Sequence, residues 1–331
     1  MAAEDLTPHL AYIEVYGARR VSAEKVRRAL GVEPGGLLPP REDLEERVSK
    51  VSGVTEARVE AVCCDGHNLV LYVGVADRES AHMEYHETPT GDLTLPPSLF
   101  SAYKNFLDEV SESIHGRNND EDLTNGYSLM ADPASRSLQQ SFLPAVAQDL
   151  ATVDRVLREA ADPEQRAAAA YLLQYAPRNE HASKLMTDGL QYALRDPDDG
   201  VRRTAIRALK AVMVGAKLHP EQQVHIEPTW YIELMNSVVW SDRREASQAL
   251  VDLTESRNPD TLALLRERAL PSVIEMARWR QLQYALPPFI LAGRMAGLDE
   301  AVIKKAWLSG ERDDVLDQVL HSRKHKQAQS S

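Results

Sequence analysis

The stretches DPEQRAAAAYLL (residues 162–173) and DPDDGVRRTAIRAL (residues 196–209) decide the fold, because they repeat one pattern. In each, an Asp-Pro pair leads to an arginine, then to an alanine three residues later and a leucine four residues after that. A looser third copy, DRREASQAL, occupies residues 242–250. The arginines of the three copies stand 36 and 41 residues apart. Repeats of this length are typical of helical solenoids, in which each helix pair buries its apolar face against a neighbouring pair. The repeats therefore predict an array of stacked helices.

Helical periodicity extends the array on both sides of the repeats. Apolar residues from Phe100 to Ile114 fall on one helix face, and residues 138–160 form a second helical pattern. After the third copy the pattern changes, and Pro287-Pro288 is expected to break a helix before an end cap. We expect an all-α repeat domain over residues 99–320 and a disordered tail over residues 321–331.

The spacing of aspartate, Val-Arg, alanine and Ala-Leu in residues 196–209 resembles the HEAT repeat of short bacterial proteins. In that family the repeated aspartate and arginine pair along the inner helices as a structural ladder. The resemblance implies three such pairs in this chain, which serve as scaffold rather than catalytic groups: Asp162 with Arg166, Asp196 with Arg202, and Asp242 with Arg243.

The first 78 residues follow a different pattern, in which strands and helices alternate. Residues 10–16 read as a strand, Ser22 caps a short helix that stops at Gly31, and residues 41–51 read as a second helix. Two more strands, over residues 54–63 and 68–76, complete the order βααββ. The fold class expected is therefore an α+β module over residues 8–78, followed by the all-α solenoid.

This order resembles a POTRA (polypeptide-transport-associated) domain. The resemblance rests on short segments of residues 8–78: Ile13-Glu-Val-Tyr-Gly17, Val21-Ser22, Ser52-Gly53-Val54 with Ala57 and Val59, and Leu69-Val-Leu-Tyr-Val73. POTRA domains dock protein partners in bacterial envelope assembly, often by adding a strand to the edge of their sheet. The resemblance implies that the sheet edge of this module binds protein.

Residues 79–98 read as an extended linker that contains the best metal candidate in the chain. His82, Glu84 and His86 stand at alternate positions, so on a strand all three side chains face one way. Zinc needs a further ligand from elsewhere, and a solvated strand explains the same pattern. The chain is therefore expected to hold no cofactor and no metal, with these three residues kept as weak candidates.

Composition excludes several classes of protein. The chain has 331 residues and a formal net charge of -12, which disfavours general binding of nucleic acid or anionic membrane. Its two cysteines are adjacent, so they cannot form the spaced disulfide framework of a small secreted domain. The sequence contains no run of about 18 apolar residues, so it predicts no membrane-spanning helix. The start of the chain has no signal-peptide pattern, so we expect either a cytoplasmic protein or an envelope protein whose signal was removed.

The function expected is a non-enzymatic scaffold or adaptor that binds a protein or peptide through the concave solenoid face, and through the sheet edge. The candidate binding residues lie on one helix of the second repeat: Arg203, Arg207 and Lys210. Four tryptophans in the last third of the chain are core residues or, where exposed, binding anchors: Trp230, Trp240, Trp279 and Trp307.

Two alternatives remain open. Some short HEAT-repeat proteins resemble phycobilin lyases, which attach a chromophore to a partner protein. No Ser-His-Asp, Cys-His or paired-carboxylate arrangement is recognisable at local spacing, so no catalytic residue is assigned. The other alternative is a metal-binding sensor that uses His82, Glu84 and His86.

Overall fold

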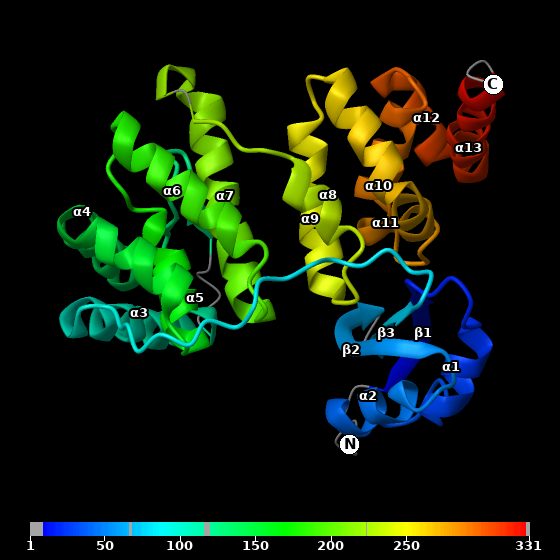
Figure 1. Ribbon diagram of the computed structural model, residues 1–331, viewed down its shortest axis with the longest axis horizontal. Coiled ribbons are helices and arrows are strands. Elements are labelled where there is room, and N and C mark those ends of the chain that lie inside the picture. Colours follow the sequence, from blue (N-terminus) through cyan, green and yellow to red (C-terminus); the bar gives the residue numbers. More distant parts are fainter. Residues whose placement is uncertain (1–8, 66–67, 116–119, 223, 329–331) are drawn as a thin grey trace, which may run out of the picture. The chain divides into compact units, whose positions relative to one another are not determined.

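The computed structural model describes residues 9–65, 68–115, 120–222 and 224–328 (Figure 1). The chain packs as two compact units. One, the sheet unit, combines residues 1–83 with residues 231–331, and the other, the helical unit, comprises residues 84–230. This division by packing cuts across the linear domain boundaries expected from the sequence, because the first and last parts of the chain belong to one unit.

The sheet unit begins with a small mixed sheet and two helices in the expected βααββ order. The elements are β1 (Leu10–Tyr16), α1 (Ala23–Leu30), α2 (Arg41–Ser49), β2 (Val54–Asp65) and β3 (Asn68–Asp77). β3 is central, with β1 parallel to it on one side and β2 antiparallel on the other. As predicted, the Ser22 hydroxyl caps α1 and Gly31 ends it in the left-handed conformation. The expected hairpin turn falls on residues 66–67, which lie outside the described residues.

Both faces of this sheet are covered. One face packs on α1 and α2 through an apolar core that includes Val26, Leu44 and Val73. The other face meets helices from the end of the chain: the ring of Tyr72 lies 5.1 Å from that of Trp240 and 5.1 Å from that of Trp279. A strand buried on both faces is apolar almost throughout, which explains the sequence NLVLYVGVAD of β3.

The remaining helices of the sheet unit follow residue 230. α8 (Thr229–Leu234) contains the boundary between the units, and the others are α9 (Trp240–Leu253), α10 (Pro259–Ala277), α11 (Leu282–Met295), α12 (Glu300–Ser309) and α13 (Arg312–Ala328). Two sequence predictions differ from this arrangement. Pro287 and Pro288 lie inside α11 and do not break it. The backbone of α13 is helical to Ala328, within the range expected to be a disordered tail.

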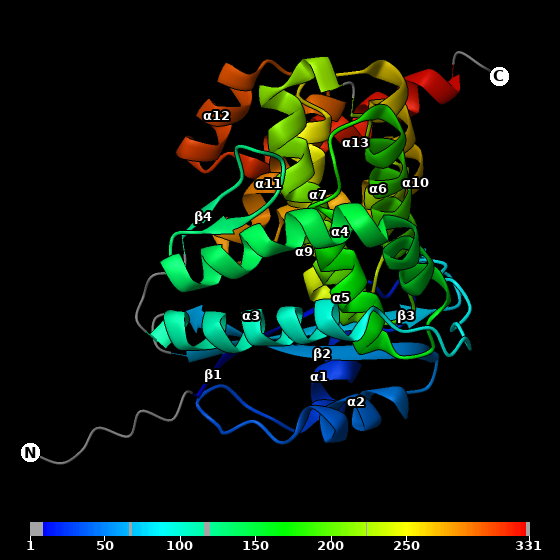
Figure 2. The same cartoon turned by 90° about the vertical axis from the view of Figure 1, so that its left-hand side faces the viewer.

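The helical unit contains the first two repeats (Figure 2). Its elements are α3 (Pro97–His115), β4 (Glu121–Asp122), β5 (Leu129–Met130), α4 (Pro133–Glu159), α5 (Pro163–Leu173), α6 (Glu180–Ala193), α7 (Asp199–Leu218) and the 3-10 turn η1 (Pro220–Gln222). α5 packs between α4 and α7, and α6 packs on α4 and α7. α4 continues through Pro144 and is kinked at Asp149.

Part of the expected linker is held against the helical unit. The N–H of Gly91 donates to the carbonyl of Glu159 at 2.9 Å, and the N–H of Ala161 donates to the carbonyl of Gly91 at 2.7 Å. The N–H of Leu95 donates to Oε1 of Gln165 at 2.9 Å. These bonds fix residues 91–95 on the start of α5, so this stretch is part of the packed structure.

A glycine sets how closely the sheet approaches the helices behind it. A Cβ atom placed on Gly74 of β3 would lie 1.8 Å from the carbonyl oxygen of Val238. We expect Gly74→Ala to lower the free energy of unfolding by about 1–3 kcal/mol, because backbone must shift to make room. Chemical denaturation of the full chain measures this.

The matched control is Gly200→Ala in the first turn of α7. The atom nearest to a Cβ placed on Gly200 would be a side-chain oxygen, Oδ1 of Asp198, at 3.0 Å. The control should change the free energy of unfolding by less than about 1 kcal/mol. Equal effects of the two substitutions would contradict the close approach at Gly74.

Candidate functional site

The repeated arginines are structural, and the first of them forms the clearest ion pair of the chain. Arg166 is 1% exposed. Its Nε donates to Oδ2 of Asp196 at 2.7 Å, and its Nη2 donates to Oδ1 at 2.9 Å. Its Nη1 donates to the carbonyls of Ala160 and Ala161, both at 2.9 Å. The guanidinium therefore joins the end of α4 to the loop that precedes α7.

The other two repeated arginines occupy the same kind of position. Nη1 of Arg202 donates to the carbonyls of Asp196 and Pro197, and its guanidinium lies 4.3 Å from the ring centre of Tyr85. Nε of Arg243 donates to the carbonyl of Ser237 at 2.5 Å, and its Nη1 donates to Oε2 of Glu275 at 2.9 Å. Each arginine thus ties down the loop before its own helix.

All three implied ladder pairs need correction. The Asp196 carboxylate pairs with Arg166 and not with Arg202, and the carboxylate partner of Arg243 is Glu275 and not Asp242. Arg166 pairs with Asp196 of the following repeat and not with Asp162, whose carboxylate instead caps α5 by accepting the N–H of Glu164 at 2.9 Å. Asp242 accepts a hydrogen bond from the hydroxyl of Ser237. α7 is capped by Asp198, because Asp196 turns its carboxylate toward Arg166.

Removing one partner of the buried pair should be costly. Arg166→Met leaves the Asp196 carboxylate buried without its bidentate partner, and we expect it to lower the free energy of unfolding by about 3–5 kcal/mol. Urea denaturation measures the loss. The exposed Arg155→Met in α4, whose ion pair with Glu159 lies at the surface, should cost less than about 1 kcal/mol. A similar cost for both would contradict the structural role of Arg166.

The predicted binding residues Arg203, Arg207 and Lys210 lie together on an exposed face of α7. Nη2 of Arg203 lies 3.4 Å from Oδ2 of Asp199 on the same helix. Nη2 of Arg207 lies 2.6 Å from Oε1 of Glu121 of β4. Lys210 has no ion-pair partner among the residues that the structure describes. The three cations form one surface, but two of them already have acidic neighbours that reduce its positive charge.

The metal candidates do not form a site. His82 is exposed and belongs to the sheet unit, whereas Glu84 and His86 belong to the helical unit. The ring of His86 stacks on that of Tyr192, with the ring centres 4.0 Å apart. Within the described part of the chain, no group of three or more His, Cys, Asp or Glu side chains is placed to hold a metal ion.

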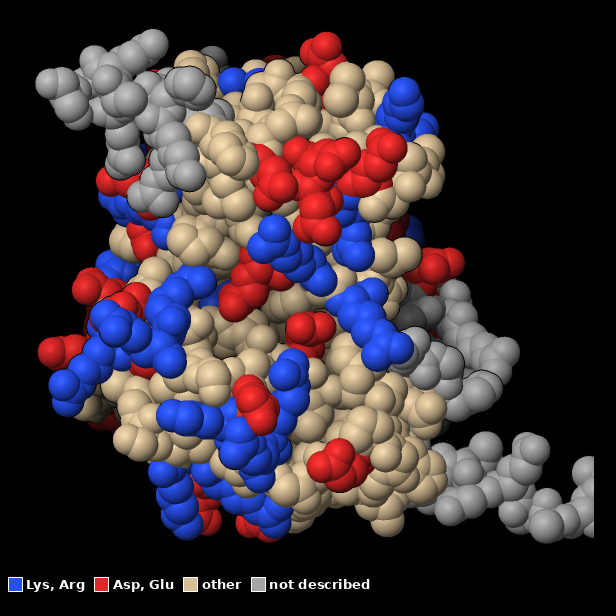
Figure 3. Space-filling view, turned by 90° about the vertical axis from the view of Figure 1, so that its right-hand side faces the viewer, with Lys and Arg blue, Asp and Glu red and all other residues tan. Residues whose placement is uncertain are grey.

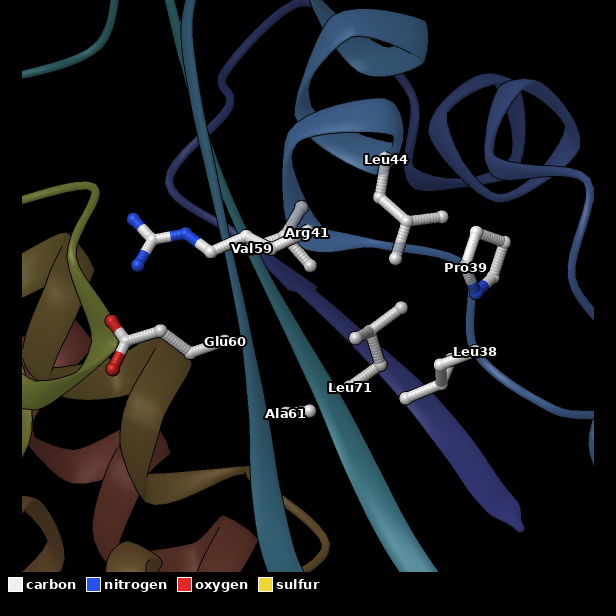
Figure 4. Close-up of a pocket in the computed structure, with 8 residues that line it drawn as sticks. All are labelled: Leu38, Pro39, Arg41, Leu44, Val59, Glu60, Ala61 and Leu71. Carbon is white, nitrogen blue, oxygen red and sulfur yellow. The ribbon is translucent and has the colours of Figure 1, made fainter.

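The outer edge of β2 carries a hollow that sequence reasoning did not locate (Figure 4). It has a volume of about 330 Å³, and most of its lining is apolar: Leu38, Pro39, Leu44, Val59, Ala61 and Leu71, with Arg41 and Glu60. The N–H of Val59 donates to Oε1 of Glu45 of α2 at 2.9 Å, so it points away from β3. Strand alternation directs the N–H and C=O of Ala61 to the same free edge.

Glu60 lies on the opposite side of β2 from the apolar part of the hollow. Figure 4 shows its carboxylate pointing away from Leu44 and Leu71. It accepts the N–H groups of Trp240 at 2.7 Å and Ser241 at 3.3 Å, at the start of α9. Burial raises its pKa above the usual value, and the nearby Asp242 adds to this, whereas the two N–H groups and Arg41 oppose it.

The raised pKa of Glu60 predicts a pH dependence of stability. The folded chain binds the proton more tightly than the unfolded chain, so the contribution of Glu60 falls as pH rises from about 4.5 through the raised pKa. Glu60→Gln keeps an acceptor for the two N–H groups and removes the charge. We expect its stability relative to the native chain to increase between pH 4.5 and pH 8, measured by urea denaturation.

An exposed carboxylate gives the control for this pH experiment. Glu33→Gln replaces a side chain at the surface, so its stability relative to the native chain should change little between the two pH values. If Glu60→Gln follows the same course as Glu33→Gln, burial does not raise the pKa of Glu60.

Figure 3 shows an acidic group in the upper part of this face and a larger basic group in its lower part, with single charged side chains between them. Across the described residues, none of the helices combines the length and apolar character needed to cross a bilayer.

Three comparisons with known proteins were made. No family model matches the chain, and no curated protein matches it. Among solved structures, the chain is similar to an engineered protein, Northeast Structural Genomics Consortium target OR329, at 15% identity and a TM-score of 0.35. The match covers 59% of this chain and 92% of that one. A likeness this distant assigns neither a family nor a function.

The tryptophans divide as sequence reasoning allowed, into core and partly exposed residues. Trp240 and Trp279 are buried between sheet and helices, whereas Trp230 and Trp307 are half-buried. Trp230 lines a second hollow, in the helical unit, together with Arg158, Tyr192 and Arg195. Sequence reasoning did not identify this cluster. Each arginine of the cluster stacks on an aromatic ring that lies more than thirty residues away in the sequence, so no local pattern reveals the pairs.

Proposed function

We propose that the protein is a non-enzymatic scaffold that binds an extended segment of a partner protein as an added strand on the free edge of β2. The observation that carries this proposal is the hollow of about 330 Å³ beside that edge. In strand addition the backbone edge supplies hydrogen bonds and a neighbouring pocket takes a side chain of the incoming segment.

The geometry of the edge supports this mode. At Val59 the edge is closed, because the Glu45 carboxylate already accepts its N–H. At Ala61 the side chain is exposed and lines the hollow with Leu38 and Leu71. An incoming strand that pairs at Ala61 places a side chain over Leu38 and Leu71. The POTRA resemblance of residues 8–78 favours the same mode.

The exposed cations of α7 are a second contact surface of the same scaffold. Lys210 is the residue of that surface with an uncompensated charge among the described residues. Arg203 and Arg207 reach acidic partners through exposed ion pairs, which are weak in water and can exchange for acidic groups on a partner. The resemblance of residues 196–209 to HEAT repeats supports protein binding by such a surface.

A proline tests the β2 edge. Ala61→Pro removes one outward N–H, and prolines are tolerated on strand edges because they leave the inner hydrogen bonds intact. The probes are phage-displayed decapeptides selected on the full chain. We expect selected peptides with alternating apolar residues, and at least about tenfold weaker binding to the proline variant, measured by fluorescence anisotropy.

Ala61→Ser is the matched control, since it keeps the N–H and nearly the same size. It should bind the selected peptides as the native chain does. Unaltered binding to a folded Ala61→Pro variant, or failure of the full chain to select any peptide, would contradict strand addition at β2.

A further inference from the structure

A hollow of about 340 Å³ lies at the C-terminal end of α6 in the helical unit. Its lining comes from four places in the sequence: the extended segment at residue 86, the end of α4, the last turns of α6, and residues 227–230. Its volume is within the range of small-ligand and peptide side-chain sites. Two arginines and two acidic residues line it, so the hollow presents both positive and negative charge.

The first arginine is held by stacking and by one carboxylate. The guanidinium of Arg158 lies 4.7 Å from the ring centre of Tyr192, whose ring also stacks on that of His86. Nε of Arg158 donates to both carboxylate oxygens of Asp154 at 3.0 Å. Among the described residues, its terminal nitrogens have no hydrogen-bond acceptor.

The second arginine is held in the same way but without an acid. The guanidinium of Arg195 lies 4.3 Å from the ring centre of Trp230, and its Nε donates to the carbonyl of Glu84 at 3.0 Å. Its own carbonyl accepts the N–H of His86 at 2.8 Å. No carboxylate pairs with Arg195 within the described part of the chain, so its positive charge is uncompensated.

His86 adds a neutral polar group beside these cations. Its Nε2 is buried and has no hydrogen-bond partner among the described residues. Burial lowers the pKa of His86, and the charge of Arg195 lowers it further, so the imidazole is neutral near pH 7. The hollow therefore presents two guanidinium groups, each held over an aromatic ring, and these suit the oxygens of a carboxylate.

Two acids, Asp188 and Glu227, also line the hollow. Asp188 is exposed on α6, and Glu227 is fixed through its N–H, which donates to Oε1 of Gln191 at 2.7 Å. Asp188 lies five residues, or about 8 Å of helix, before the end of α6 at Ala193, and Arg195 follows two residues later. These acids would repel a phosphate dianion. An extended peptide spans about 10 Å in three residues, so one segment can reach both charges.

We propose that this hollow binds a peptide segment that presents a carboxylate to Arg158 and Arg195 and a basic group to Asp188 and Glu227. The site lies in the helical unit and does not depend on strand addition at β2. Stacking on Tyr192 and Trp230 holds the two guanidinium groups in place before binding, which reduces the entropy lost when the carboxylate arrives.

The test uses the full chain and rhodamine-labelled hexapeptides of alanine that carry one Glu and one Lys, separated by zero to three residues. Matched peptides replace Glu by Gln or Lys by norleucine. Fluorescence anisotropy should show the tightest binding at a separation of two or three residues. It should also show at least about tenfold weaker binding of both neutral analogues.

Variants assign the binding to the hollow. Arg195→Gln should weaken the Glu-containing peptide at least about tenfold, and Asp188→Asn should remove the preference for Lys over norleucine. Arg28→Gln, exposed on α1 of the sheet unit, is the matched control and should leave binding unchanged. Because Asp188 is exposed, its variant keeps the test decisive even if Arg195→Gln fails to fold.

Several results would overturn the proposal. They are the absence of binding by any hexapeptide at 1 mM, equal binding of charged and neutral peptides, and unaltered binding to the folded variants at Arg195 and Asp188. Free glutamate and inorganic phosphate serve as competitors. If either competitor displaces the peptide when present at the same concentration as the peptide, the hollow is a small-anion site and the peptide-binding proposal is contradicted.

Discussion

The buried arginine of each repeat is the constraint on which the helical packing depends. A guanidinium is charged at every accessible pH and presents five donors in a fixed plane, so inside a protein it requires acceptors on several sides. Arg166 finds them in two main-chain carbonyls and in both oxygens of Asp196. Arg243 finds them in the carbonyl of Ser237 and in Glu275. Both acids lie about thirty residues further along the chain, so the bond fixes one repeat against the next.

This constraint extends to segments outside the repeats. Tyr16 of β1 covers the guanidinium of Arg243 at 4.6 Å, as Tyr85 covers that of Arg202. Glu275 also accepts the N–H of Gly17, so the end of β1 is joined to the same ion pair. The sheet is consequently part of the repeat packing in its unit. Its second face is therefore used in folding, and the edge of β2 is where we propose that a partner binds.

Sequence reasoning succeeded where the cause is local and failed where it is distant. The caps at Ser22 and Gly31 depend on bonds within a few residues, and the sequence predicts both of them. The partner of Arg166 could not be identified, since several aspartates stand at similar spacing and only packing selects Asp196. α11 passes through Pro287-Pro288 because Ala285, Phe289 and Leu291 are buried, and their packing outweighs the lost hydrogen bonds. No pattern in the sequence shows that the first and last parts of the chain share one unit.

The same comparison separates arginines that build the fold from those available for binding. Arg166 donates from Nε and from both terminal nitrogens, and it is closed to solvent. Arg158 and Arg195 donate from Nε alone among the described residues, and each is held over an aromatic ring. Stacking fixes a guanidinium without using its outer donors, whereas bidentate pairing consumes them. The residue type is identical in all three, and the number of donors left unpaired among the described residues separates Arg166 from Arg158 and Arg195, for which we propose a binding role.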